Sequence, residues 1–139
     1  MNPIVEFSNQ RKVTREFLGT ADEARSLTSA WMNFAQANKY SYQFDWLSRP
    51  IIQYPQDIVA MQEVIWRVKP DLIIETGIAH GGSLIFSASM LALLDMNNAI
   101  ERGESINPKK SCRKVLGVDI DIRQHNRTAI EAHPMGSWI

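Results

Sequence analysis

The chain has 139 residues, of which 45% are hydrophobic and 22% charged, and its 15 basic and 15 acidic residues leave no net charge. This composition is that of an ordinary globular protein, and the balanced charge gives no basic surface for nucleic acid or an anionic membrane. We therefore expect neither as a partner.

Other features of the sequence indicate the cellular compartment. Cys112 is the one cysteine, which excludes an intrachain disulfide and suits a reducing environment. The N-terminus lacks the apolar stretch of a signal peptide, and the longest apolar segment, Leu84–Met96, is too short to cross a bilayer. We predict a cytoplasmic protein without a membrane span.

The first part of the chain is predicted to contain one helix. Residues 1–20 show no hydrophobic period and indicate an irregular arm. Thr20 and Glu23 have capping-box spacing, so we expect a helix from there to about Asn38, with Trp31 and Phe34 packed in a core. The aromatic-rich segment that follows, residues 40–49, is predicted to be a loop.

The second part alternates helices and strands. Pro55 suits the first turn of a helix that ends near Lys69. Further elements are predicted as strands at 72–75 and 114–118, helices at 81–96 and 122–133, and a polar surface insertion at 97–113. This order predicts an α/β fold: a doubly wound, Rossmann-like parallel sheet that is truncated after its second strand–helix unit. We expect residues 1–49 to form an arm, helix and loop, and residues 50–139 the N-terminal half of the Rossmann-like domain.

The turn after the first predicted strand indicates an adenosyl cofactor. The strand ends on Glu75, and the chain turns at Gly77 and enters a helix through Gly81, Gly82 and Ser83. This G-x-x-x-G-G pattern lacks the second glycine of a dinucleotide fingerprint. A carboxylate at the strand end would repel a pyrophosphate but can hold the ammonium group of S-adenosylmethionine (SAM).

Asp119 ends the second strand, where a carboxylate can bind both ribose hydroxyls. Alternatives remain open for each residue. The paired glycines could serve only close helix–sheet packing, and Glu75 could cap a backbone N–H. Asp119 and Asp121 could shape a turn, and capping the last helix is the favoured role for Asp121. His80 could bond to backbone or reach substrate. The pair Asp119 and Asp121 has no third ligand nearby, so we predict no metal site, and no residue is assigned as catalytic.

Several motifs resemble the cephalosporin hydroxylase family, over about residues 45–135. They are P-I-I-Q-Y-P-Q-D at 50–57, Q-E at 62–63, P-D-L-I-I-E-T-G at 70–77, G-G-S at 81–83 and G-V-D-I-D-I-R at 117–123. The family includes the protein of cephamycin 7-methoxylation and rhamnosyl O-methyltransferases of glycolipids, which links it to lipid biosynthesis.

The resemblance implies a class I SAM-dependent methyltransferase fold. It also implies that Glu75, Gly77 and Ser83 hold the methionine part of SAM, that Asp119 holds the ribose, and that the Gln53–Tyr54 backbone lies against the cofactor. Several family members use Mg²⁺ held by carboxylates from later strands, which are absent here.

From this resemblance we expect a SAM-dependent O-methyltransferase that acts on a hydroxyl of a small molecule, glycan or glycolipid, in a truncated and inactive form. The alternatives are a non-catalytic nucleotide-binding or assembly subunit and a non-functional gene fragment. The exposed sheet edges of a half domain predict marginal stability and either self-association or a partner that supplies the missing half.

Overall fold

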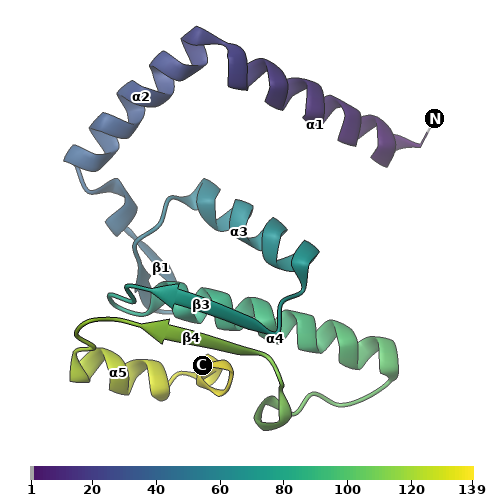
Figure 1. Cartoon of the computed structure of the whole chain (residues 1–139), viewed down its shortest axis with the longest axis vertical. Coiled ribbons are helices and arrows are strands. Elements are labelled where there is room, and N and C mark those ends of the chain that lie inside the picture. The colour runs from purple at the N-terminus through teal and green to yellow at the C-terminus, as the bar shows by residue number, and fades with distance from the viewer. Residues whose placement is uncertain (1) are drawn as a thin grey trace. The chain divides into compact units, whose positions relative to one another are not determined.

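The structure is a computed structural model that describes residues 2–139, and it consists of two compact units, Met1–Tyr40 and Ser41–Ile139 (Figure 1). The first unit contains helix α1 (Pro3–Thr20) and helix α2 (Asp22–Ala37). The second unit contains the strands.

The irregular arm expected at the N-terminus is wrong, because α1 covers most of it. Asn2 caps the helix by accepting a hydrogen bond from the backbone N–H of Ile4 at 2.9 Å, and Pro3 occupies the first turn. No residue of α1 is buried. A helix without a buried face does not need apolar residues at helical spacing, so its sequence carried no periodic signal.

Helix α2 confirms the predicted helix but not its cap. Ala21 is the N-cap residue and makes no side-chain capping bond. Thr20 instead ends α1, where its hydroxyl donates to carbonyl oxygens of its own helix. Trp31 and Phe34 are exposed rather than packed in a core, and they stack on each other with ring centroids 6.1 Å apart.

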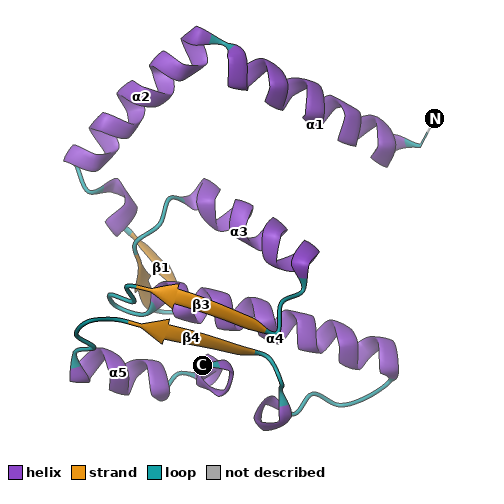
Figure 2. Cartoon of the chain, viewed as in Figure 1, coloured by secondary structure: helices purple, strands orange, loops and turns teal. Residues whose placement is uncertain are grey.

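The second unit combines helices with two small sheets (Figure 2). From residue 40 onward the elements are η1 (Tyr40–Tyr42), β1 (Phe44–Trp46), β2 (Arg49–Ile51), α3 (Pro55–Val68), β3 (Leu72–Thr76), α4 (Gly82–Arg102), η2 (Pro108–Lys110), β4 (Lys114–Val118), α5 (Gln124–Glu131) and η3 (Pro134–Trp138). Strands β1 and β2 pair antiparallel, and β3 and β4 pair parallel. This is consistent with an α/β fold, although residues 2–139 contain no larger, doubly wound sheet.

The aromatic segment predicted as a loop forms a hairpin in the structure. Leu47 and Ser48 make its turn with positive φ angles of 45° and 69°. The hairpin packs on α4, where the Trp46 ring meets the Phe86 ring edge-to-face at 5.0 Å. Strands of three residues are too short to show alternation, which is why the pattern missed them. The boundary predicted between residues 49 and 50 falls inside β2.

Strands β3 and β4 confirm the two predicted strands. Glu75 lies opposite Gly117 in the parallel register. The face of the sheet that carries Val115 is buried and lies against α4 (Figure 1). The opposite face exposes four apolar side chains: Leu72, Ile74, Leu116 and Val118.

Helix α4 forms much of the core, and it is longer than predicted. It runs to Arg102, where Gly103 ends it with a φ of 66°, so the polar insertion is correspondingly shorter. By length and composition this helix could cross a membrane, which corrects the expectation that its apolar segment is too short. Half of its apolar window is buried inside the protein, as in the core helix of a globular domain.

The C-terminal elements pack against the same core. Helix α5 begins after Arg123, so Asp121 is not its N-cap as expected. Its inner face buries Ile130. The chain ends in η3, whose Trp138 is buried and donates an indole hydrogen bond to Asp95 of α4 at 2.8 Å.

Candidate functional site

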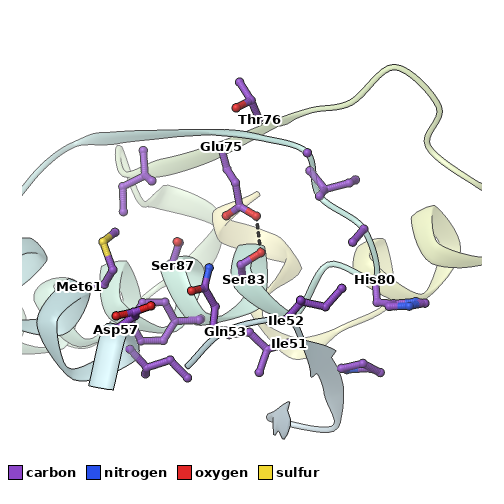
Figure 3. Close-up of a pocket in the computed structure, with 18 of the residues that line it drawn as sticks. Ile51, Ile52, Gln53, Asp57, Met61, Glu75, Thr76, His80, Ser83 and Ser87 are labelled. Atoms are coloured by element: carbon purple, nitrogen blue, oxygen red, sulfur yellow. Dashed lines mark hydrogen bonds between the residues drawn. The ribbon is translucent and has the colours of Figure 1, made fainter. Parts of the chain in front are cut away.

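A cavity of about 430 Å³ opens where β3 turns into α4 (Figure 3). Its wall is formed by the end of β3, the turn, the first turns of α4 and residues 50–61. Four of the predicted site residues line it: Gln53, Glu75, Gly77 and Ser83. The structure therefore brings together residues from three separate segments of the chain.

Glu75 and Ser83 form the polar centre of this cavity. Glu75 points from β3 toward α4, and the Ser83 hydroxyl donates a hydrogen bond to Glu75 Oε1 (Figure 3). Thr76, the next residue on the strand, points the other way. Burial raises the pKa of Glu75, and the Ser83 hydrogen bond only partly opposes this. A cationic group placed beside Glu75 would favour its charged form.

The N-terminus of α4 faces the same cavity. Gly81 is its N-cap, with a φ of 82°, and no side chain caps the helix there. A long helix without a side-chain cap presents backbone N–H groups and the positive end of its dipole. A carboxylate or another anion is the group that such an end attracts.

The two glycines have a packing role that needs no ligand. A Cβ on Gly82 would lie 2.2 Å from the carbonyl oxygen of Pro50, and one on Gly81 would lie 2.4 Å from Cδ1 of Ile130. Neither position tolerates a larger residue without movement of its neighbours. Close packing, one of the alternatives for these glycines, is therefore observed. Gly81 does not line the cavity, and its predicted contact with the cofactor stays a prediction.

Asp119 lies outside this cavity and holds the turn. Its Oδ2 accepts the backbone N–H of Ile78 at 2.8 Å, and its Oδ1 accepts that of Asp121 at 3.2 Å. These backbone hydrogen bonds lower the pKa of Asp119, so it is a carboxylate at neutral pH. Asp119 therefore shapes the turn, as one of the alternatives for this residue proposed. Its binding of the ribose stays a prediction.

A second, polar cavity of about 290 Å³ contains Asp119. Ala79 and His80 line both cavities, so both cavities border the same turn. Tyr54 lines neither of them, and it serves as the N-cap residue of α3. Its predicted contact with the cofactor through the backbone stays a prediction.

Sequence reasoning missed two residues that support the turn. Arg49 and Asn126 donate hydrogen bonds to the carbonyl oxygens of His80 and Ala79. The available signal was Asn126, a polar residue on the otherwise apolar side of the last helix. No sequence pattern indicated Arg49, because it lies in a segment that was predicted to be a loop.

Within residues 2–139 no group of three or more His, Cys, Asp or Glu side chains could hold a metal ion. Asp119 and Asp121 are the two carboxylates that line the second cavity. The described residues therefore do not fit the Mg²⁺ that the resemblance attributes to several members of the family.

Comparison with protein families defines the class to which this fold and site belong. A methyltransferase family model matches residues 38–139, well over half of the chain. The chain belongs to this family, Rhamnosyl O-methyltransferase/CmcI, and the resemblance to the cephalosporin hydroxylases is thereby confirmed. Membership implies use of SAM as the methyl donor. Searches of curated proteins and of solved structures gave no match.

Proposed function

We propose that this chain binds SAM across the turn between β3 and α4 and takes part in O-methyl transfer to a hydroxyl of a small molecule or glycan. The single observation that carries the proposal is the half-buried Glu75–Ser83 pair at the uncapped N-terminus of α4. That pair combines an anionic group with a helix end that attracts anions. An amino acid head group, with one ammonium and one carboxylate, has the complementary charges.

Each residue has a distinct task in this proposal. Glu75 accepts hydrogen bonds from the ammonium group, while Ser83 fixes the orientation of the Glu75 carboxylate. The first N–H groups of α4 bind the carboxylate of the methionine part. Gln53 lines the same cavity and provides a further polar group. Asp119, in the second cavity, accepts the ribose hydroxyls on the far side of the turn.

When bound, SAM supplies the methyl group. The cavity walls hold the donor in one orientation, and such positioning provides much of the rate in a transfer between two bound molecules. The cavity contains two further titratable side chains, Asp57 and His80. We infer that residues 2–139 bind the methyl donor. We also infer that their parallel strands belong to a doubly wound sheet of the methyltransferase type.

Calorimetric titration with S-adenosylhomocysteine (SAH) and with NAD tests the cofactor. We expect SAH to bind more tightly, because Glu75 repels a pyrophosphate and attracts an ammonium group. Asp119→Ala should weaken SAH binding, because it leaves paired polar groups without partners. Tighter binding of NAD than of SAH would overturn the assignment, and an unchanged affinity in Asp119→Ala would remove Asp119 from the site.

The second candidate function is that of a non-catalytic module, which binds SAM without transferring its methyl group. Incubation with SAM and acceptor hydroxyl compounds, followed by measurement of the SAH formed, distinguishes a binding module from a methyltransferase. SAH binding without any turnover would favour the module, and acceptor-dependent SAH production would favour the transferase.

A further inference from the structure

The turn between the two cavities is held by side chains from distant parts of the second unit. Arg49 Nε, on β2, donates to the carbonyl oxygen of His80 at 3.0 Å, and Arg49 Nη2 donates to the same oxygen. Asn126 Nδ2, on α5, donates to the carbonyl oxygen of Ala79 at 2.9 Å. Arg49 Nη2 also donates to Asn126 Oδ1 at 3.2 Å. The two side chains thus form one Arg49–Asn126 bridge under two consecutive carbonyl groups.

The bridge is buried at its Asn126 end, while the hydrogen bonds from Arg49 to His80 are exposed. Asn126 is only 5% exposed, and a buried amide is stable only when its polar atoms are paired, which the bridge achieves for both its oxygen and its nitrogen. Arg49 is half-buried and lies on the hairpin that packs on α4. Both ends of the bridge therefore have fixed positions.

The turn requires such support. Ala79 has a φ of 43°, in the left-handed region that a residue with a Cβ adopts at a cost in energy. Strained conformations of this kind persist when surrounding groups hold them. Here the bridge holds the carbonyl side of the turn, while Asp119 holds its Ile78 N–H.

We propose that Arg49 and Asn126 are positioning residues that set the cofactor-binding turn in the conformation that ligand binding needs. This inference rests on the proposed function for the identity of the ligand. Since Ala79 and His80 line both cavities, a displaced turn would alter the site for the methionine part and the site for the ribose together. Asn126 also lines the second cavity, whereas Arg49 lines neither cavity and acts on the ligand only through the turn.

Titration of the full chain with SAH tests the proposal. We expect Arg49→Ala and Asn126→Ala each to weaken binding by at least about tenfold, as expected for loss of hydrogen bonds that involve a charged or buried group. The double variant should bind little worse than either single one, because both act through one bridge. The matched control is Arg127→Ala, the neighbour of Asn126, which is exposed and pairs with Glu131 along α5. It should bind like the wild type.

Hydrogen exchange gives a readout that needs no ligand. The amides of Ile78 and Gly81, which donate to Asp119 and to the Ile78 carbonyl, should exchange faster in both alanine variants, while amides in β3 and β4 keep their wild-type protection. Faster exchange throughout the unit would instead indicate general unfolding. The Arg49→Lys variant then distinguishes local loss of support from general unfolding. It keeps the charge and one donor for the His80 carbonyl group but loses the hydrogen bond to Asn126.

We expect Arg49→Lys to show intermediate affinity and locally faster exchange in the turn. Wild-type affinity and wild-type turn exchange in both Arg49→Lys and Asn126→Ala would overturn the proposal. A wild-type chain that does not bind SAH would contradict the proposed function. The exchange measurement would still decide whether the bridge holds the turn.

Discussion

At the scale of single residues, Glu75 carries a cost to folding that its proposed role explains. Burial disfavours its charge, and the Ser83 hydrogen bond compensates only in part. We expect Glu75→Gln to leave the free energy of unfolding at neutral pH unchanged or raised, because a buried charge is removed. SAH affinity should fall by roughly tenfold or more, since the ammonium loses its anionic partner. Urea melts and calorimetry on one preparation measure both effects, and a destabilised variant with wild-type affinity would contradict this account.

The raised pKa of Glu75 also predicts a dependence on pH. As pH falls through the folded-state pKa, the carboxylate gains a proton and no longer attracts an ammonium group. We therefore expect wild-type SAH affinity to fall as pH is lowered from neutral into the acidic range, with Glu75→Gln nearly independent of pH over that range. For folding the sign is opposite: a raised folded-state pKa means that the folded state binds the proton more tightly, so protonation of Glu75 favours folding. Titrations at a series of pH values check the first effect, and a flat wild-type profile would argue against a charged contact.

At the scale of elements, the contact of α4 with β2 depends on Gly82. A Cβ there would lie 2.2 Å from the backbone oxygen of Pro50, which has no flexible end that could move aside. We expect Gly82→Ala to lower the free energy of unfolding by about 2 kcal/mol or more, as for overpacked cores. Gly19→Ala in α1 is the control, because no atom lies within 4 Å of its Cβ position. That change should stabilise by about 0.5–1 kcal/mol, and equal effects of the two changes would contradict the packing argument.

Asp95 of α4 joins the segment before β4 and the C-terminal η3. Its carboxylate accepts hydrogen bonds from Ser111 at 2.5 Å, Arg113 Nη1 at 2.5 Å and Trp138 at 2.8 Å. Burial alone would raise the pKa of Asp95, but the bonds from Ser111, Trp138 and Arg113 together lower it. We expect Asp95→Asn to destabilise the protein by about 1–3 kcal/mol at neutral pH, since Arg113 loses the nearer of its two carboxylate partners and keeps only Asp71, 3.8 Å from its Nε.

The pH dependence of this effect follows from the lowered pKa. The stabilisation is fully present above the unfolded-state pKa of about 3.9 and is lost as pH falls through the folded-state value. The difference between wild type and Asp95→Asn should therefore shrink below pH ~4, as urea melts at several pH values would show. Glu101→Gln, a change at an exposed position on the same helix, serves as control and should have little effect at any pH. A difference that persists at low pH would mean that Asp95 acts by packing rather than by charge.

At the scale of the whole second unit, the outer face of the parallel sheet is apolar and uncovered. Leu72, Ile74, Leu116 and Val118 are between 48% and 61% exposed there. Parallel sheets are normally covered on both faces, and a contiguous apolar patch favours association. We expect the chain to self-associate with rising concentration, and the double change of Leu116 and Val118 to Thr to raise the monomer fraction while SAH affinity is kept. Size-exclusion chromatography with light scattering measures this, and a wild-type chain that stays monomeric at every concentration would refute it.

The sequence predicted the elements that have a strong local signal. Strands β3 and β4 are short apolar runs between turn residues, and α3 starts at Pro55 and ends at Val68, next to Lys69 where its end was expected. Prediction from the sequence failed where the hydrophobic pattern was weak. Helix α1 has no buried face, and each strand of the hairpin has only three residues. The family assignment also came from the sequence, because several short motifs with fixed spacing carry more information than any single element.

For the candidate site, the sequence by itself determined which residues gather at the end of β3, since Glu75, Gly77 and Ser83 are close in the chain and the strand–turn–helix geometry brings them together. Only the tertiary structure decided that Asp119 binds the turn from a separate cavity and that Gly82 accommodates Pro50. It also revealed the bridge between Arg49 and Asn126, which are 77 residues apart. Local patterns record the spacing of neighbours along a helix or strand. Contacts between distant segments depend on how the elements pack, and no local pattern specifies that.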